Sequence, residues 1–390
     1  MKRLNPLRGM DNVSDDDAMS SFGKVPFIKL RDAVNVNISS TGRVELRGSG
    51  VPVTETPYKN LWQSPLHGDL FGTLNTELVK INPADWSHVQ LNVQLKGDIN
   101  YLVVNNFIVI SDSSDLYKYD GSSVEKLTIS TPPEPMAHSA DGSLLEGTYN
   151  LAISWSKHGR ESGLSDTVTI QCSGGINLVL PYNYSADADQ ATIYMTERNG
   201  SELLKVATVP VNTASFTISQ DKDLTRAAQF KHLSPMPSGK FLKLWRGRLV
   251  TADKNLLYFS QALNFHLCDE RYDYIALPQR VTFVEPVESG IWVGQSNCVV
   301  FLSGSDVRDL RLVQTGAKAP VPGTALRVNS DLLGELSAGL ESVLWLAENG
   351  YCIGTPSGNL VEAHANTLKG ITAKGGQSVR FDDRIVTVLQ

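Results

Sequence analysis

Short apolar runs separated by polar turns recur along most of this chain. Between Leu102 and Asp120, three apolar runs are interrupted at Asn105-Asn106 and again at Ser111 to Asp115. Asparagine tolerates the left-handed backbone that a tight hairpin needs, so this stretch predicts a three-stranded antiparallel meander. The same plan recurs at 242–259, 291–302, 343–361 and, as a half unit turning at Asp382-Asp383, at 379–388.

The spacing of these meanders indicates a structural repeat. Trp245 and Trp292 are 47 residues apart, and Trp292 and Trp345 are 53 apart. Near-regular units of about fifty residues are typical of a β-propeller, and the pattern predicts an all-β propeller of about six blades. If the first strands are aligned, equivalent positions fall on Val103, Trp245, Trp292, Trp345 and Phe381, with Phe71 as a weaker sixth.

One segment departs from this repeat. After Thr131-Pro-Pro-Glu-Pro, six or seven short alternating strands follow within about ninety residues, which predicts an inserted fibronectin-like or immunoglobulin-like β-sandwich at 134–222 with Trp155 in its core. A short helix is expected at Asp221 to Gln229. The remaining divisions are an N-terminal arm at 1–29 outside the fold, a first propeller part at 30–133 and a second at 223–390.

The two ends of the chain are predicted to close the propeller. Val34, Val36 and Ile38 alternate with polar residues before a turn at Ser39 to Gly42, which indicates a hairpin ending near Leu46. The last repeat is two strands short of a blade at Gln390. We therefore expect the N-terminal hairpin to complete that blade, since closure removes exposed sheet edges.

Composition narrows the class of function. The chain has 390 residues, 41% hydrophobic and 19% charged, and a net charge of −6, which gives no electrostatic reason to bind nucleic acid. In the basic and aromatic stretch from Phe241 to Arg248, the arginines Arg246 and Arg248 are interpreted as hairpin-tip charges. The N-terminus lacks the apolar core of a signal peptide, so we expect synthesis and retention in a cytoplasm.

Residues for catalysis or metal binding are not grouped in the sequence. The cysteines Cys172, Cys268, Cys298 and Cys352 lie far apart, which favours buried reduced thiols over a zinc site. No nucleophile elbow, metalloprotease or nucleotide-binding motif is present. We therefore expect no catalytic, metal or cofactor site. A propeller glycosidase would instead need converging carboxylates, for which Asp98, Asp253, Glu285 and Glu348 are candidates.

The N-terminal region resembles a known family. The stretches LNPLRGMDNVSDDDAM and LRDAVNVNISSTGRVELRGSG resemble the start of the tail-nozzle proteins of short-tailed phages (podoviruses), also called tail tubular protein B or head-completion and packaged-DNA-stabilisation proteins. Position 37 is Asn, where the family usually has Asp. The matching residues are Gly9, Met10, Asn12, Val13, Arg31, Asp32, Ala33, Val34, Asn35, Val36, Gly42, Arg43 and Arg47.

Two later stretches extend the resemblance. SWSKHGRESGLSD, which contains Glu161 and Ser162, resembles the family's Gly-x-Glu-Ser loop. APVPGTAL, which contains Pro322, Gly323 and Thr324, resembles its Pro-x-Pro-Gly-Thr turn. The resemblance implies structural or interface roles for these residues rather than catalytic ones.

The resemblance also implies a function and partners. It describes a virion structural protein that forms a ring, expected to be a hexamer, at the distal end of a short tail. The ring would extend the DNA channel, help to retain packaged DNA and guide its ejection. Implied partners are further copies of the chain, a tail adaptor or portal-side ring, and tail fibres, spikes or a needle. DNA would pass without specific binding, and assembly would occur in the host bacterial cytoplasm.

Two other classes of function stay open at this stage. The first is a β-propeller that binds or hydrolyses host surface glycans, which predicts a carboxylate cluster at one channel mouth. The second is a propeller scaffold of a host cytoplasm, which predicts no phage genes nearby.

Overall fold

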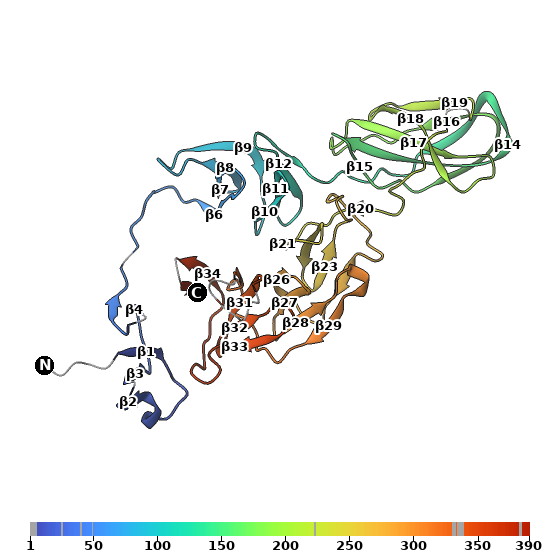
Figure 1. Cartoon of the computed structure of the whole chain (residues 1–390). Coiled ribbons are helices and arrows are strands. Elements are labelled where there is room, and N and C mark those ends of the chain that lie inside the picture. The colour runs from blue at the N-terminus through green and yellow to red at the C-terminus, as the bar shows by residue number, and fades with distance from the viewer. Residues whose placement is uncertain are drawn as a thin grey trace. The chain divides into compact units, whose positions relative to one another are not determined.

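Almost all of the regular secondary structure in the described part of the chain is β-strand (Figure 1). The computed structural model describes residues 6–390, apart from positions 25, 40, 49, 222–223, 330–332, 334–338 and 382–383. Two compact units divide the chain, one formed by Met1–Pro57 with Leu277–Gln390 and the other by Tyr58–Ala276. Within the described residues, no helix is long and apolar enough to cross a membrane.

Three four-stranded antiparallel sheets lie in the unit Tyr58–Ala276, and in each the strands follow chain order. The first comprises β6 (Lys59–Gln63), β7 (Leu70–Leu74), β8 (Glu77–Ile81) and β9 (His88–Gln94). The second comprises β10 (Asn100–Val104), β11 (Phe107–Ser111), β12 (Leu116–Tyr119) and β13 (Val124–Lys126). The third comprises β21 (Lys240–Trp245), β22 (Arg248–Asp253), β23 (Leu256–Phe259) and β25 (Tyr274–Ala276).

Two more sheets of the same kind lie in the unit that contains both chain termini. One comprises β26 (Val281–Val287), β27 (Gly290–Gln295), β28 (Val299–Ser303) and β29 (Arg311–Gln314). The other comprises β30 (Leu326–Val328), β31 (Ser342–Ala347), β32 (Gly350–Gly354) and β33 (Leu360–Glu362). A four-stranded antiparallel meander is the blade of a β-propeller, which confirms the predicted fold class.

The predicted turn chemistry accounts for the tight hairpins of these blades. Asn105 has φ 53° between β10 and β11, and Lys254 has φ 52° between β22 and β23. At the β21–β22 turn, Arg246 and Gly247 have φ 46° and 73°. Two consecutive positive φ values are those of a type I′ turn, whose twist matches that of the flanking strands.

The predicted equivalence of the aromatic positions is wrong. Trp245 lies on the first strand of its blade, whereas Trp292 and Trp345 lie on the second strands, β27 and β31. Val103 is on a first strand and Phe71 on a second. The alignment failed because a buried aromatic residue can occupy either the first or the second strand of a blade. The spacing between aromatic residues therefore does not reveal which strand carries each one.

Neighbouring blades share their hydrophobic cores. Trp292 and Trp345 are both fully buried, with ring centroids 5.6 Å apart, and Phe283 lies 5.5 Å from Trp345. This cluster joins the blades β26–β29 and β30–β33. A second cluster, which includes Val104 and Leu249, joins the blades β10–β13 and β21–β25. Blade stacking therefore supplies the buried area that no single sheet has.

The inserted segment forms one six-stranded antiparallel sheet around its own core. Its order is β18-β17-β14-β16-β19, and β15 also pairs with β14. The core contains Tyr149, Leu151, Ile153, Ile176 and Leu178 among other residues. Its strands are β14 (Met136–Lys157), β15 (Arg160–Glu161), β16 (Val168–Val179), β17 (Gln190–Thr196), β18 (Leu203–Pro210) and β19 (Ser215–Ile218).

Some strands of this inserted domain are longer than the sequence pattern predicted. β14 and β16 each continue through glycines, and their pairing shifts register between Ala140 and Leu144. Gly174 has φ +106°, and a Cβ on Gly142 would lie 2.3 Å from the Gly174 carbonyl oxygen. Glycine thus permits a bulge where other residues would end the strand.

Two finer expectations for this domain need correction. Trp155 is buried, but it packs with Ile129 and Val211 in a small separate cluster rather than in the main core. The expected helix at Asp221 to Gln229 is absent from its described part, and positions 222–223 lie outside the described residues. Instead, the Arg226 carbonyl accepts from the Lys205 N–H, and the Ala228 N–H donates to the Leu203 carbonyl, both at the start of β18. The side chains of Leu224 and Ala228 pack against the hydrophobic clusters of the inserted domain.

The N-terminal segment is not a free arm. β1 (Leu7–Met10) pairs in parallel with β3 (Phe27–Leu30), which also pairs with β2 (Ser20–Ser21). The prediction of an arm at 1–29 outside the fold is therefore wrong for the residues that the structure describes. The predicted hairpin follows as β4 (Val36–Ile38) and β5 (Val44–Leu46).

The predicted closure of the last blade is also wrong. β34 (Gly376–Phe381) and β35 (Arg384–Leu389) form a separate two-stranded sheet, as do β4 and β5, and the predicted turn at 382–383 lies outside the described residues. The chain ends meet elsewhere. The Asn12 side-chain amide donates to the Lys369 carbonyl and accepts from its N–H, both at 2.9 Å.

Candidate functional site

The motif residues of the predicted family do not gather in one pocket. They lie at three separate joints of the fold: the N-terminal sheet, the root of the inserted domain, and the turn before β30. A polar groove lies apart from these joints, in the unit Tyr58–Ala276.

A buried carboxylate organises the N-terminal joint. Asp11 is completely buried, and its Oδ1 accepts from the main-chain N–H groups of Val13 and Ser14 at 3.1 and 2.9 Å. Its Oδ2 accepts from Lys29 Nζ at 2.6 Å and Ser14 Oγ at 2.8 Å. The Lys29 ammonium, together with these donors, holds the pKa of Asp11 well below its usual range. Arg31 then reaches the Ser14 carbonyl and pairs with Asp16 at 2.6 Å.

Sequence reasoning missed Asp11 and Lys29, the residues on which this joint depends. The available signal was an aspartate followed by main-chain donors and a serine three positions later, which is a local capping pattern. The partner Lys29 lies eighteen residues away, and only the β1–β3 pairing brings it to Asp11.

The remaining N-terminal motif residues shape turns and the β4–β5 hairpin. Arg47 donates to the Asn35 carbonyl through its N–H at 3.0 Å and to Asn37 Oδ1 through Nε at 3.1 Å. Positive φ values occur at Gly9, Asn35 and Gly42. The other contacts are Met10 paired with Leu30, Asp32 Oδ1 accepting from the Ala33 N–H, and Arg43 paired with Glu45 at 3.4 Å.

The second joint holds the inserted domain against a blade. Ser162 Oγ accepts from the Trp155 N–H at 2.9 Å and donates to the Gly163 carbonyl at 2.8 Å. The Glu161 carboxylate accepts from the Tyr194 hydroxyl and from Ser154 Oγ. The main-chain carbonyl of Glu161 accepts from His266 Nε2 at 2.9 Å, and His266 belongs to the β23–β25 loop of a blade.

This joint is expected to weaken on acidification. Burial, helped by nearby Arg160, lowers the pKa of His266, although the Glu161 carbonyl acts in the opposite direction. Because the folded pKa lies below the unfolded value of about 6.5, His266 contributes stability above that pH and loses it as the pH falls. The protection factors of the β15 amides, which correct for the intrinsic pH dependence of hydrogen exchange, should therefore fall between pH 7.5 and 5.5.

His266→Gln tests this prediction, because a glutamine amide can still donate but does not titrate in this range. The pH dependence of the β15 protection factors should then flatten. His138→Gln, a change at an exposed position on β14, provides the control and should leave the wild-type profile intact. An unchanged profile in the His266 variant would contradict the assignment.

The third joint attaches the C-terminal hairpin to its neighbouring blade. The Pro322 carbonyl accepts from the Gly376 N–H at 2.9 Å. Thr324 is fully buried, and its Oγ1 donates to the Val321 carbonyl at 2.7 Å and accepts from the Leu346 N–H at 3.1 Å. Gly323 has φ +83°, and a Cβ there would lie 2.2 Å from the Gly376 carbonyl oxygen.

Gly323→Ala is therefore expected to loosen the C-terminal hairpin. The substitution combines an unfavourable positive φ with a backbone clash, and should cost about 2 to 3 kcal/mol. Faster hydrogen exchange of β34 and β35 would report the loss. Gly370→Ala is a matched control, because Gly370 has φ +74° but nothing within 4 Å of its Cβ position. Equal effects of both variants would exclude the proposed contact.

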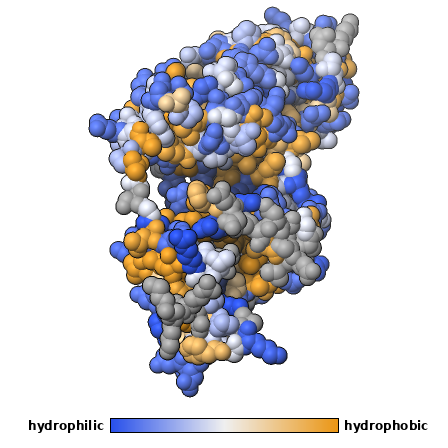
Figure 2. Space-filling model, turned by 60° about the vertical axis from the view of Figure 1, so that its left-hand side comes forward, coloured by the Kyte–Doolittle hydropathy of each residue, from blue (hydrophilic) through white to orange (hydrophobic). Residues whose placement is uncertain are grey.

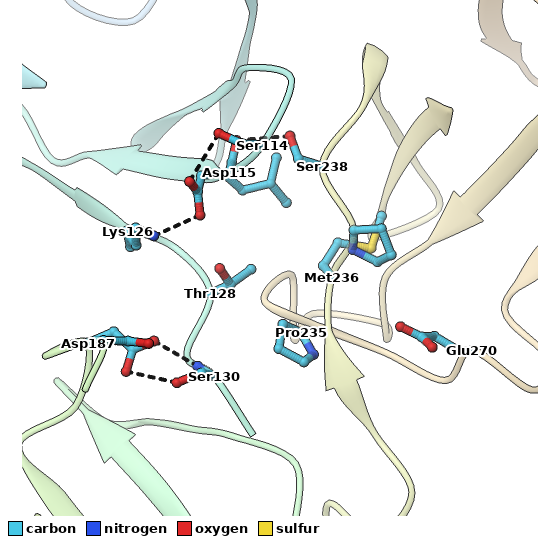
Figure 3. A pocket seen from close by; sticks show the side chains of 13 residues that line it. Ser114, Asp115, Lys126, Thr128, Ser130, Asp187, Pro235, Met236, Ser238 and Glu270 are labelled. Atoms are coloured by element: carbon cyan, nitrogen blue, oxygen red, sulfur yellow. Dashed lines mark hydrogen bonds and ion pairs between the residues drawn. The ribbon is translucent and has the colours of Figure 1, made fainter. Parts of the chain in front are cut away.

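A polar groove lies within the unit Tyr58–Ala276 (Figure 3). Its volume is about 450 Å³, and it opens between the second blade, the inserted domain and the segment before β21. Leu116, Pro235, Met236 and Pro237 supply apolar surface. The polar lining consists of Ser114, Asp115, Lys126, Thr128, Ser130, Ser185, Asp187, Ser238 and Glu270.

An ion pair and hydrogen bonds hold several of these polar side chains in place. Asp115 Oδ1 pairs with Lys126 Nζ at 2.8 Å. Asp187 accepts from the Ser130 N–H at 2.9 Å and from Ser130 Oγ at 3.1 Å, which ties the inserted domain to the linker before it. Asp115 and Asp187 are thus held in place by hydrogen bonds, which gives the groove a defined shape.

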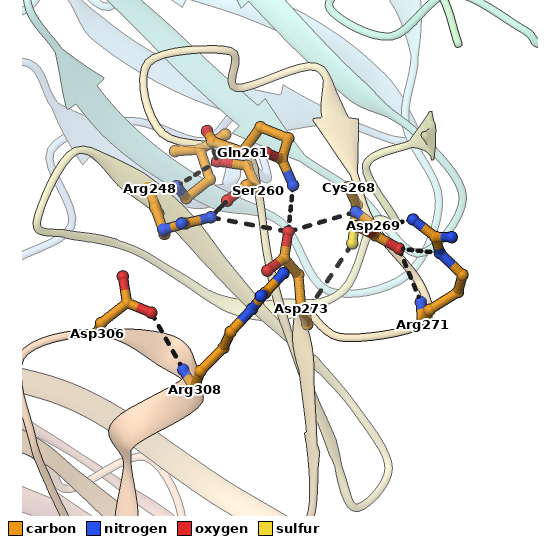
Figure 4. Close-up of polar contacts among 10 residues, drawn as sticks. Arg248, Ser260, Gln261, Cys268, Asp269, Arg271, Asp273, Asp306 and Arg308 are labelled. Atoms are coloured by element: carbon orange, nitrogen blue, oxygen red, sulfur yellow. Dashed lines mark hydrogen bonds and ion pairs between the residues drawn. The ribbon is translucent and has the colours of Figure 1, made fainter. Parts of the chain in front are cut away.

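A second polar cluster fixes the loop between β23 and β25 (Figure 4). Asp273 accepts from Gln261 Nε2, and Arg248 Nη1 lies 3.7 Å from it and donates to the Ser260 carbonyl at 2.8 Å. Asp269 and Arg271 form a two-pronged pair, at 2.9 Å for each bond. Arg248 closes the β21–β22 turn opposite Trp245, as its interpretation as a hairpin-tip charge implies, and its side chain also fixes this loop.

The candidate carboxylates for glycoside hydrolysis occupy separate structural roles. Asp98 pairs with Lys240, and Glu285 lies 3.5 Å from Arg327, which also contacts Glu341 at 3.1 Å. Asp253 ends β22, and Glu348 lies in the β31–β32 turn. Among the described residues, no group of three His, Cys, Asp or Glu side chains could hold a metal ion.

All four cysteines are free thiols. Cys172, Cys268 and Cys352 are buried, and Cys298 is half-buried. Burial raises the pKa of Cys268 and of Cys352 to about 12. Since the thiolate is the reactive form, these two side chains are poor nucleophiles at neutral pH.

No family model matches this sequence, and no curated protein matches it either. The fold is similar to BBS1N solved in complex with ARL6DN, with TM-score 0.34, 11% identity, and coverage of 86% of this chain and 90% of that one. It is also similar to the Neurospora crassa Pan2 WD40 domain, with TM-score 0.32, 10% identity, and coverage of 84% of this chain and 88% of that one. For Saccharomyces cerevisiae Sqt1 the TM-score is 0.32 and the identity 11%, with coverage of 84% of this chain and 77% of that one. Overlaps of this size carry no inference about function.

Proposed function

We propose that this chain is a phage virion structural protein, a nozzle subunit that assembles into a ring at the distal end of a short tail. The ring extends the DNA channel, helps to retain packaged DNA and guides its ejection. The observation that carries the proposal is a pair of unfinished sheets in the unit that contains both chain ends. These are the hairpins β4–β5 and β34–β35, each with only two strands in the described part of the chain.

Both hairpins expose apolar side chains. Leu46 on the first hairpin is 83% exposed, Val34 just before that hairpin is 78% exposed, and Phe381 on the second hairpin is 62% exposed. Figure 2 shows one face of the molecule, with exposed hydrophobic side chains in orange. Other exposed apolar residues on these hairpins and the segment after β5 are Val44, Val51, Val53, Val379, Val388 and Leu389. Two-stranded sheets with exposed apolar faces are marginal alone and pair readily with other chains.

The family motifs give these surfaces a role in assembly. The N-terminal and third joints carry most of the residues that resemble the tail-nozzle family, and these two joints hold the two unfinished hairpins. A nozzle must let DNA slide without holding it, and a net charge of −6 agrees with that requirement. The partners in this proposal are further copies of the chain, an adaptor or portal-side ring, and tail fibres, spikes or a needle.

Electron cryomicroscopy of the purified protein, mixed with a phage tail adaptor ring, tests the proposal. The expected result is a closed ring of subunits with β4–β5 and β34–β35 at contacts between chains. A single copy bound to the adaptor, or tight binding to double-stranded DNA at an ionic strength of about 0.15 M, would contradict it.

A further inference from the structure

An exposed aromatic pair that the proposed assembly does not use lies in a loop that lines the groove of Figure 3. Tyr182 and Tyr184 lie in the same loop as Ser185 and Asp187, which line the groove. Their ring centroids are 5.0 Å apart at an interplanar angle of 62°. Tyr184 is 90% exposed and Tyr182 is 55% exposed. Large aromatic side chains left in water beside a groove offer apolar faces on which a ligand can lie.

The same groove contains hydrogen-bonding side chains that have no partner within the described part of the protein. Within the described part of the chain, Thr128, Ser185 and Glu270 line it and make no side-chain hydrogen bond or ion pair. The two hydroxyls can donate to and accept from ligand hydroxyl groups, and the carboxylate can accept from them. The neighbouring Asp115 and Asp187 already have protein partners and stay in place when a ligand binds.

We propose that this groove binds a neutral saccharide. Aromatic faces suit the C–H surfaces of sugar rings, while hydroxyl and carboxylate groups suit their hydroxyls. A volume of about 450 Å³ lies within the range of small-molecule sites. A protein partner would instead bury a mostly apolar core, whereas this lining is chiefly polar.

The charge of the groove selects against acidic sugars. Asp115, Asp187 and Glu270 supply three carboxylates, against the single ammonium of Lys126. Uronic and sialic acids would meet repulsion there, whereas uncharged hexoses and N-acetylhexosamines would not. The site is one of binding, because the carboxylates of Asp115 and Asp187 are occupied by Lys126 and Ser130 rather than free to act on a glycosidic bond.

The test uses the full-length protein with maltotriose, lactose and N,N′-diacetylchitobiose as neutral probes and 3′-sialyllactose as the anionic comparator. Titration calorimetry and saturation-transfer NMR should show at least one neutral probe binding with a Kd of about 1 mM or tighter, and 3′-sialyllactose binding at least about tenfold more weakly. Absence of binding by all three neutral probes at about ten times that concentration overturns the proposal.

Variants locate the binding site. Tyr184→Ala and Glu270→Gln should each weaken binding at least about fivefold, because one removes a stacking face and the other a charged acceptor. Tyr184→Phe keeps the ring and should retain most of the affinity. Leu145→Ala is the matched control, since Leu145 is 62% exposed on the same inserted domain. Saccharide binding that survives both Tyr184→Ala and Glu270→Gln also overturns the proposal. Because these residues belong to the unit Tyr58–Ala276, whereas both unfinished hairpins belong to the other unit, ring assembly is expected to be unaffected in every variant.

Discussion

Val34→Asp combined with Leu46→Asp is expected to abolish ring assembly while leaving the fold of the isolated chain unchanged. Both side chains are highly exposed in the single chain, so the substitutions cost little there. In a ring, the same carboxylates would be buried without partners, and an unpaired buried charge costs several kcal/mol. Assembly on the adaptor ring, followed by mass photometry and electron microscopy, should fall at least about tenfold.

A control separates this effect from a general effect of surface charge. Val89 is 65% exposed on β9, in the other unit, and Val89→Asp should leave assembly intact. Circular dichroism and thermal unfolding of all variants should match the wild type. Rings that form normally with Asp at both 34 and 46 would show that this hairpin does not contribute to the interface.

Trp292→Ala is expected to destabilise the unit that holds the chain ends by about 4 kcal/mol, the range for truncating a fully buried tryptophan. Its ring packs between two blades beside Trp345, and its Nε1 donates to the Thr355 carbonyl at 3.0 Å. The substitution thus leaves a cavity and removes one of the two hydrogen bonds to the Thr355 carbonyl, which also accepts from the Gly358 N–H at 3.1 Å. Hydrogen exchange of β27 and β31 measures the loss directly, without requiring the two units to unfold together.

Two further variants check the cause of this loss. Trp292→Phe should lose less stability, because it retains a ring against Phe301 and Trp345. Trp86→Ala removes a half-buried tryptophan in the β8–β9 connection of the other unit, and should leave β27 and β31 unaffected. Equal exchange rates in Trp292→Ala and the wild type would exclude a shared core between these blades.

The candidate residues could be predicted from the sequence only in part. Glu161, Gly323 and Thr324 were singled out through motif resemblance, and the structure gives each a specific contact. Lys29 and His266 were missed, because their partners lie far away in the sequence. His266 meets Glu161 across 105 residues, and no local pattern marks such a pair.

The sequence by itself determined the local hairpins of this protein. Alternation with a period of two, and residues that tolerate positive φ such as Asn105 and Gly247, specify strands and turns through contacts between near neighbours. The propeller class followed from the number and spacing of these units.

Only the tertiary structure decided which strands share a sheet at the chain ends, and which side chains share a groove. The Asn12–Lys369 contact, rather than the pairing of two hairpins, joins the termini. The polar groove likewise joins Asp115 to Ser238 and Ser130 to Asp187 across long stretches of chain. Such contacts depend on how the folded strands and hairpins pack against one another. An alternating sequence pattern produces many strand edges that could pair almost equally well, so it does not specify which of them meet.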